Sequence, residues 1–153
     1  MALKTYNGFS GAYREKQGRK VYAAFKRGDL PKPSLCVGCG ATPEQGYHLM
    51  AHNEDYHRPF GFVEICFSCH MAIHRRFKEL DIWHRYRDLA ANGWQPPRGR
   101  DYEKWVNTWY SVKRLAIPEV RNTSWLHTLP DVEPDLYTED AAEGLFDGQW
   151  SEV

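Results

Sequence analysis

The sequence has no long hydrophobic run: no stretch approaches the roughly 20 apolar residues that a membrane-spanning helix needs. Residues 1–10 also lack the apolar stretch of a secretory signal peptide. Cysteine is scarce, with four residues in all, and no segment repeats another. We therefore expect a cytosolic protein with no membrane partner. Because that compartment disfavours disulfides, the four cysteines are expected to be metal ligands.

Basic residues are missing from the end of the chain. The last of the 20 Lys and Arg residues is Arg121, so residues 122–153 carry eight acidic groups and a formal charge of −8. Residues 1–121 carry the opposite charge, +8, and the whole chain is neutral. A basic body with an acidic end favours a polyanion as partner. The alternative is a solvated extension, although large apolar residues such as Trp125 and Trp150 are unlike a purely solvating tail.

Length and composition suit one compact domain with an appendage. The chain has 153 residues, of which 42% are hydrophobic, with six Trp and nine Tyr, enough for a core over part of its length. We expect a flexible N-terminus over 1–12, a domain over 13–117 with its core in 34–91, and an acidic, irregular tail over 118–153. The tail is expected to bind either the basic body or another protein.

The fold class indicated by the pattern of apolar residues is α+β. Three-and-four spacing predicts helices over 13–27, 70–91 and 102–116, with Gly28 and Asp101 as caps. Short runs of strand composition at 47–52 and 60–65 are expected to pair as a hairpin. Aromatic residues at helical spacing, such as Trp83, Trp105 and Trp109, are expected in the core.

The most specific motif is the spacing of the cysteines, C-x2-C-x26-C-x2-C, formed by Cys36, Cys39, Cys66 and Cys69. Four thiolates in two chelating turns satisfy a closed tetrahedral Zn²⁺ site. Such a site leaves no coordination position for substrate, so it is expected to be structural. Any catalytic group must lie elsewhere.

Three histidines lie near this motif in the sequence. His52 ends the first predicted strand, His70 follows the last cysteine, and His74 is one turn further along the same helix face. If the zinc holds the hairpin to the helix, these imidazoles can form a facial site for a second divalent metal, Mg²⁺, Mn²⁺, Ni²⁺ or Zn²⁺, with positions left for water and a phosphate oxygen. The alternative for each histidine is an ordinary hydrogen-bonded surface residue.

These motifs together resemble the zinc-bearing HNH endonucleases common in phages. The resemblance covers about residues 23–77 and is most specific in the two C-x-x-C pairs, the segment His52-Asn53-Glu54-Asp55-Tyr56-His57-Arg58-Pro59 and the segment Cys69-His70-Met71-Ala72-Ile73-His74. It implies a small ββα-metal core on a treble-clef-like zinc scaffold, flanked here by additional helices. It also implies metal-dependent hydrolysis of DNA in a phage or bacterial cytosol. By the resemblance His52 and His70 are metal ligands, and His74 matches the extra ligand of the colicin-type branch.

One catalytic position departs from the family. Family members usually carry a second histidine directly after the first, as general base, whereas this sequence has Asn53. An amide does not accept a proton at neutral pH, and general base catalysis contributes about 10² to 10⁴ in rate. Three explanations compete: another group takes the role (His57, His48, Glu54 or Asp55), a metal lowers the pKa of bound water sufficiently, or the site binds without cutting.

Basic residues on the flanking helices and a proline-rich loop are the expected contacts with nucleic acid. Phosphate contacts of this kind give sequence-independent, salt-sensitive affinity. The candidates are Lys26, Arg27, Arg75, Arg76, Lys78, Arg85, Arg98 and Arg100, and the alternative for each is a solvated surface charge. The sequence thus leaves three functions open: a DNA endonuclease, a catalytically silent module of that fold that binds DNA or a protein, and a zinc-stabilised interaction domain.

Overall fold

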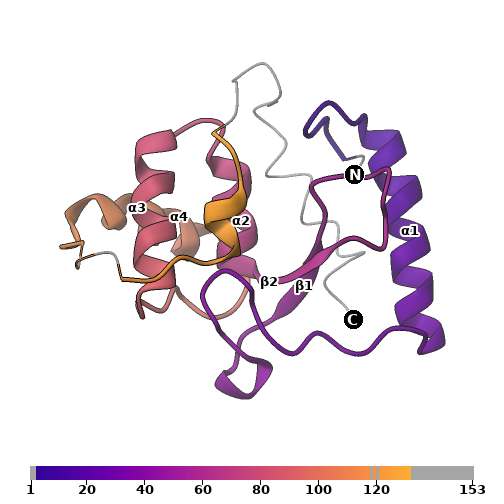
Figure 1. Ribbon diagram of the computed structural model, residues 1–153, viewed down its shortest axis with the longest axis horizontal. Coiled ribbons are helices and arrows are strands. Elements are labelled where there is room, and N and C mark those ends of the chain that lie inside the picture. Colours follow the sequence, from indigo (N-terminus) through magenta and orange to yellow (C-terminus); the bar gives the residue numbers. More distant parts are fainter. Residues whose placement is uncertain (1–2, 118, 120, 132–153) are drawn as a thin grey trace.

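The computed structural model describes residues 3–117, 119 and 121–131, and these form an α+β fold (Figure 1). A two-stranded hairpin occupies the centre. The long N-terminal helix α1 stands on one side of it, and α2, α3 and α4 gather on the other side. Residues 132–153, most of the predicted acidic tail, lie outside the described residues. In the described part of the chain, no helix is both long and apolar enough to cross a membrane.

Helix α1 (Gly11–Arg27) is bounded by two caps. At its start, the Ser10 Oγ accepts a hydrogen bond of 3.2 Å from the Tyr13 backbone N–H. At its end, Gly28 has a φ of 80°, in the left-handed region that glycine adopts without strain. The predicted end of this helix is confirmed, and its start lies at Gly11 and not at residue 13.

The predicted hairpin is confirmed with shorter strands. Strand β1 (Leu49–His52) pairs antiparallel with β2 (Val63–Cys66), in a register that aligns Leu49 with Cys66 and His52 with Val63. All four residues of β1 are buried. His52 therefore lies at the loop end of the hairpin, and Cys66 lies at the opposite end, where the next helix begins.

The single helix predicted over 70–91 is wrong: the chain forms two helices. Helix α2 (Phe67–Arg75) starts directly after β2, and α3 (Leu80–Ala91) follows a tight turn. In that turn the Arg76 side chain is drawn into the interior and Phe77 is buried, so two side chains that a straight helix would separate both reach the core. Apolar spacing continues across the turn, which is why the sequence does not reveal the break.

The last predicted helix is also shorter than expected. Helix α4 (Tyr102–Ser111) has Asp101 as its N-cap, as predicted, and tightens into the 3₁₀ turn η2 (Val112–Arg114). Two further 3₁₀ turns, η1 (Pro43–Gln45) and η3 (Trp125–Thr128), were not expected from the sequence. The predicted core position of the aromatic residues is confirmed, because Trp83, Trp105 and Trp109 are fully buried.

Candidate metal centres

Four cysteines from three different segments form one cluster. Cys36 and Cys39 lie in a turn before η1, Cys66 ends β2, and Cys69 is in the first turn of α2. Their sulfur atoms all lie within 4.8 Å of one another. Cys39 Sγ and Cys66 Sγ are 3.8 Å apart, well beyond the roughly 2.05 Å of a disulfide bond. The cluster could hold a metal ion such as zinc.

The backbone around the sulfurs is shaped for close packing. Position 38 has no room for a side chain, because a Cβ there would lie 2.9 Å from Cys69 Sγ, and glycine avoids this clash. The Gly38 N–H donates to Cys36 Sγ at 3.4 Å, and the Cys69 N–H donates to Cys66 Sγ at 3.5 Å. Amides directed at sulfur stabilise thiolates, which are the form of cysteine that binds metals.

The electrostatics of the cluster call for a cation. Hydrogen bonds from Cys39, Cys66 and Cys69 hold the pKa of the Cys36 thiol far below its usual range. The same contact with Cys36, together with burial, raises the pKa values of Cys66 and Cys69. Four sulfurs this close together ionise jointly only at a cost in charge repulsion. A divalent ion would reverse this balance, and four sulfurs would complete its tetrahedral coordination with no position left for substrate.

A second cluster consists of three histidines. His52 comes from β1, and His70 and His74 come from α2, which packs against both strands and so carries them to His52. One ring nitrogen of each lies within 4.8 Å of those of the other two. The ring centroids are 5.0 Å apart for His52–His70 and His70–His74, and 5.5 Å apart for His52–His74. The sequence prediction that these three meet is confirmed.

These histidines are buried, and burial favours the neutral form of an imidazole. Their exposed fractions are 2% for His52, 6% for His70 and 0% for His74. Burial is the largest cause that lowers the pKa of each imidazole below its ordinary value. Within the described part of the chain, neither ring nitrogen of His74 has a hydrogen-bond partner. A neutral, buried and unpaired imidazole beside two others suits a transition-metal ion, because the metal would satisfy the nitrogen.

Glu54 is the polar centre that positions this cluster. Its Oε2 lies 2.5 Å from His52 Nε2, and its Oε1 accepts hydrogen bonds from Arg76 Nη2 at 2.8 Å and Asn7 Nδ2 at 2.9 Å. The Tyr6 hydroxyl also donates to Oε2. Burial alone would raise the pKa of the Glu54 carboxyl, but His52 and Arg76 hold it far below its usual range. A carboxylate that orients a histidine in this way is the usual outer support of a metal site.

This arrangement bears on which group could replace the general-base histidine that the family resemblance implies at the position of Asn53. Glu54 is one of the candidates to replace it, but its oxygens already receive four donors and its lowered pKa makes it a weak proton acceptor. His57 and Asp55 are exposed, and His57 Nδ1 contacts the Tyr13 hydroxyl at 3.1 Å. His48 is half-buried, and burial lowers its pKa.

Asn53 is a structural residue of the loop that joins the strands. Its Nδ2 donates to the backbone carbonyls of Arg58 at 2.9 Å and Pro59 at 3.2 Å. Its Oδ1 accepts from the Asp55 N–H at 3.1 Å. Asn53 is only 3% exposed. The Asn53 amide therefore stabilises the loop with two donated hydrogen bonds and one accepted one. A neutral imidazole has one donor and one acceptor and could not replace all three.

We expect Asn53→Asp to destabilise the protein by about 3 kcal/mol, because a buried carboxylate would face two carbonyl oxygens that have lost their donor. The measurement is urea denaturation of both proteins at neutral pH. Asn122→Asp is the matched control, since Asn122 is exposed and should change stability by no more than about 0.5 kcal/mol. Equal midpoints for Asn53→Asp and the wild type would contradict this role.

Two aromatic side chains cover the histidines. The Tyr6 ring lies 4.3 Å from the His74 ring, centroid to centroid, and Tyr6 is fully buried. The Trp125 ring lies 6.2 Å from that of His52. Tyr6 lies within residues 1–12, for which the sequence predicts a flexible N-terminus, and Trp125 belongs to η3. Neither was predicted to lie at the site.

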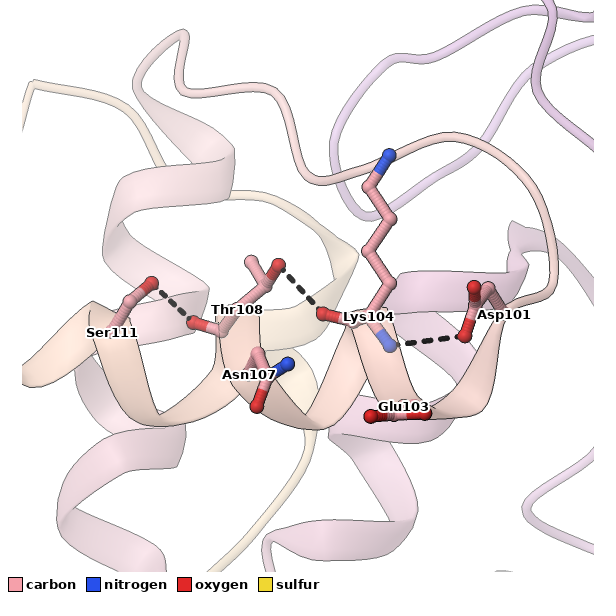
Figure 2. Close-up of a pocket in the computed structure, with 6 residues that line it drawn as sticks. All are labelled: Asp101, Glu103, Lys104, Asn107, Thr108 and Ser111. Atoms are coloured by element: carbon pink, nitrogen blue, oxygen red, sulfur yellow. Dashed lines mark hydrogen bonds between the residues drawn. The ribbon is translucent and has the colours of Figure 1, made fainter.

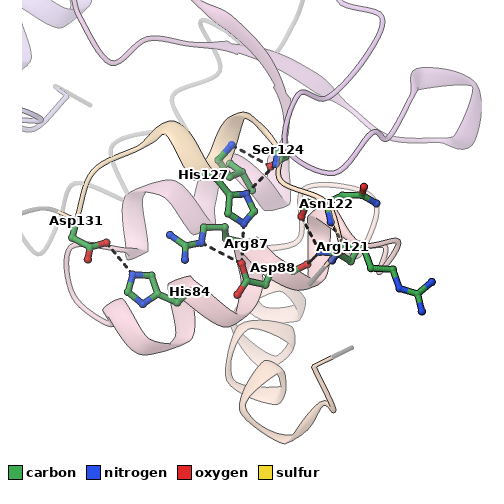
Figure 3. A network of polar contacts seen from close by, with 10 residues as sticks. His84, Arg87, Asp88, Arg121, Asn122, Ser124, His127 and Asp131 are labelled. Atoms are coloured by element: carbon green, nitrogen blue, oxygen red, sulfur yellow. Dashed lines mark hydrogen bonds and ion pairs between the residues drawn. The ribbon is translucent and has the colours of Figure 1, made fainter. Parts of the chain in front are cut away.

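A network of polar contacts holds η3 against α3 (Figure 3). His127 Nε2 contacts Asp88 Oδ1 at 2.8 Å, and its Nδ1 accepts from the Ser124 N–H at 3.0 Å. Asn92 Oδ1 accepts from the backbone N–H groups of both Arg121 and Asn122 at 2.9 Å. Helix α3 therefore holds Trp125 beside His52, although α3 contributes no residue to the histidine cluster.

The predicted nucleic-acid contacts separate into two groups. Those with exposed side chains are Lys26, Arg27, Lys78, Arg98 and Arg100. Arg27 is paired with Asp29 at 2.9 Å, and the Arg98 guanidinium lies 5.9 Å from the Tyr47 ring. The exposed group therefore remains available to a polyanion, with Arg27 partly neutralised.

The second group is engaged inside the protein. Arg76 is 1% exposed and forms an ion pair with Glu54, so it faces the interior and not a phosphate. Arg85 donates to the carbonyls of Val112 at 3.2 Å and Leu115 at 2.5 Å. Arg75 donates to Glu79 and to the Tyr110 hydroxyl. These three arginines connect elements of the fold.

A shallow hollow of about 410 Å³ lies on α4, and none of its lining residues belongs to either cluster (Figure 2). Its polar groups bond within their own helix: the Lys104 N–H donates to Asp101 Oδ1, and the Thr108 hydroxyl donates to the Lys104 carbonyl. Each of these contacts caps or reinforces the helix. We therefore assign no chemistry to this surface.

Comparison with models of protein families, with curated proteins and with solved structures finds no match to this chain.

Proposed function

We propose that this protein is an HNH-like, divalent-metal-dependent DNA endonuclease that hydrolyses phosphodiester bonds on a zinc-stabilised ββα-metal scaffold. The resemblance of residues 23–77 to that family supports the proposal, together with a hairpin followed directly by a helix that carries two of the three histidines. The exposed basic residues are consistent with a polyanionic substrate.

The observation that carries the proposal is the difference between the two clusters. Four sulfurs saturate a tetrahedral ion, whereas three imidazoles leave at least one coordination position, which is the usual distinction between structural and catalytic metal sites. His52, His70 and His74 would hold the second ion. A bound divalent ion supplies Lewis-acid chemistry there and lowers the pKa of water.

The chain's own residues would contribute orientation. Glu54 fixes the His52 ring, and Arg76 and Tyr6 hold Glu54 in place. Asn53 takes no proton from water, because an amide is not basic at neutral pH, and its Nδ2 is already bound to the Arg58 and Pro59 carbonyls. The Trp125 ring lies 6.2 Å from the His52 ring and would border a phosphate bound at the cluster.

A second candidate is a catalytically silent module of the same fold that binds DNA or a protein. The closed cover of Tyr6 and Trp125, and an Asn53 that serves the loop, favour it. In this case the histidine cluster would bind a metal for stability alone.

A supercoiled-plasmid nicking assay with Mg²⁺, Mn²⁺, Ni²⁺ or Zn²⁺ distinguishes the two. For the enzyme we expect metal-dependent nicking that His70→Ala reduces by at least about 100-fold, while His84→Ala, a change at a half-buried histidine paired with Asp131, retains it. DNA binding without nicking under any of these metals would reject the enzyme and support the silent module. Nicking that persists in His70→Ala would show that the activity does not come from this site.

A further inference from the structure

Helix α1 presents a basic stripe to solvent. Tyr13, Lys16, Lys20, Ala23 and Arg27 recur at three-and-four spacing and therefore share one face of the helix. At 1.5 Å per residue, this stripe extends over about 21 Å. Beside it lies a hollow of about 560 Å³ whose lining residues are Lys16, Arg19, Lys20, Ala23, Arg27 and Phe60.

The charges in this hollow are largely uncompensated. Its lining contains four basic residues and no acidic one. Arg27 is paired with Asp29. Among the described residues, no hydrogen bond or ion pair is formed by the side chains of Lys16, Arg19 and Lys20, and all three are exposed. Such a surface attracts a polyanion, and its affinity would depend strongly on salt.

Phe60 is the unusual member of the lining. It is 54% exposed, the largest exposed fraction among the large hydrophobic residues of the described chain. It comes from the loop between β1 and β2, and the neighbouring Phe62 packs against Phe25 of α1 with ring centroids 5.6 Å apart. The ring is therefore held beside the basic stripe without being used by the core.

Hydrogen bonds brace the backbone of the loop that carries Phe60. Asn53 donates to the carbonyls of Arg58 and Pro59, and the Gly61 N–H donates to the Arg58 carbonyl at 2.9 Å. These bonds surround Phe60 on both sides in the sequence. A loop backbone that is already ordered loses less conformational entropy when a ligand packs on its side chains.

A second hollow borders the same helix and the same loop. It is lined by Asn7, Gly8, Phe9, Ser10, Tyr13 and His57. Phe9 stacks on Tyr13 with ring centroids 5.9 Å apart, and the His57 ring lies 5.0 Å from that of Phe9. Asn7 joins this hollow to Glu54, which contacts His52. Aromatic rings thus occur at the end of the stripe nearest the histidine cluster.

We propose that this face of α1 and the 53–62 loop binds an unpaired strand of nucleic acid. Phe60 stacks on a base, and Lys16, Arg19 and Lys20 contact the phosphates. This combination of a basic track with an exposed ring is the chemistry that recognises single strands, because only an unpaired base offers its flat face. The inference rests on the proposed function for its nucleic-acid partner and goes further in naming an unpaired strand as the substrate class.

The test is the affinity of the full-length protein for a fluorescein-labelled single-stranded oligonucleotide, measured by anisotropy without added divalent metal, beside the duplex of the same sequence. We expect Phe60→Ala to weaken single-strand binding about tenfold and Phe60→Trp to retain it. The matched control is Leu35→Ala, another exposed apolar side chain, which should bind as the wild type does. Circular dichroism of each variant confirms that it is folded.

The salt dependence tests the cations. Lys20→Ala should reduce the slope of log affinity against log salt by about 0.7, the value for one phosphate contact on a single strand. Lys104→Ala, on α4 beside Asp101 and Glu103, should leave the slope unchanged. Single-strand affinity that is equal in Phe60→Ala and wild type, or a preference for the duplex, would overturn the inference.

These outcomes are distinguishable from failure of the proposed function. A protein that nicks plasmid DNA but binds single strands equally well with and without Phe60 retains the endonuclease proposal and loses this one. A protein that never nicks, yet loses single-strand affinity in Phe60→Ala, is a silent module with the binding face intact. Absence of binding to either oligonucleotide would overturn the inference.

Discussion

Cys69→Ser is expected to abolish zinc binding at the cysteine cluster and, with it, cooperative unfolding. Cys69 is fully buried, in the first turn of α2, and its sulfur also accepts a hydrogen bond from the Tyr86 hydroxyl at 3.4 Å. Zinc binding to structural sites contributes about 10–16 kcal/mol in zinc-finger peptides at neutral pH, which exceeds the whole stability of many small domains. Loss of zinc binding would therefore cost more than the free energy of unfolding of a typical small domain.

Metal analysis of the purified protein and thermal unfolding monitored by circular dichroism would measure both effects. Ser34→Ala is a suitable control, because Ser34 is exposed close to Cys36 and uses only its backbone N–H, which donates to Glu64. A Cys69→Ser protein that retains zinc and unfolds at the wild-type temperature would show that the four sulfurs do not form a metal site.

For the histidine cluster, we expect His74→Leu to have opposite effects in the two metal states. Without an added divalent ion, the variant should be more stable than the wild type, by about 1–3 kcal/mol. The reason is that leucine removes two buried nitrogens that have no partner among the described residues. With the ion present the wild type should gain about 2.7 kcal/mol when the free ion is roughly 100 times its dissociation constant, and the variant should gain nothing.

Thermal unfolding with and without Mn²⁺, Ni²⁺ or Zn²⁺ would measure this reversal. His84→Leu provides the comparison, since His84 is 37% exposed at its side chain and lies on α3, away from the cluster. If His74→Leu were less stable than the wild type without metal and responded equally to the ion, His74 would be an ordinary core residue.

The sequence is sufficient to predict both clusters, because their information is local. Each C-x-x-C pair is a chelating turn by itself, and His70 and His74 share a helix face by their spacing. What brings Cys36 to Cys69, and His52 to His74, is the hairpin, whose two strands are recognisable from composition. The order of the motifs along the chain is therefore enough to predict which residues form each cluster.

The surroundings of the clusters were not predictable in the same way. Tyr6 lies 46 positions before His52 in the sequence, and no periodicity links the two residues. Arg76, predicted as a contact with nucleic acid, is 1% exposed, and its spacing of three from Ile73 places it on a buried face. Trp125 lies beside His52 in a segment that contacts between Asp88 and His127 and between Asn92 and Arg121 hold to α3. Contacts of this kind depend on tertiary packing, which local patterns do not encode.

Cys66 has three simultaneous duties: it ends β2, caps α2 by accepting from the Cys69 N–H, and supplies a sulfur to the first cluster. The start of the helix is thus fixed by the cysteine cluster itself, and each later residue is rotated by about 100° about the helix axis. A single inserted or deleted residue between Cys66 and His70 would turn both imidazoles away from His52 even if all ligands were kept. The two clusters are therefore coupled through the number of residues between Cys66 and His70, and a change in that number would disrupt the histidine cluster.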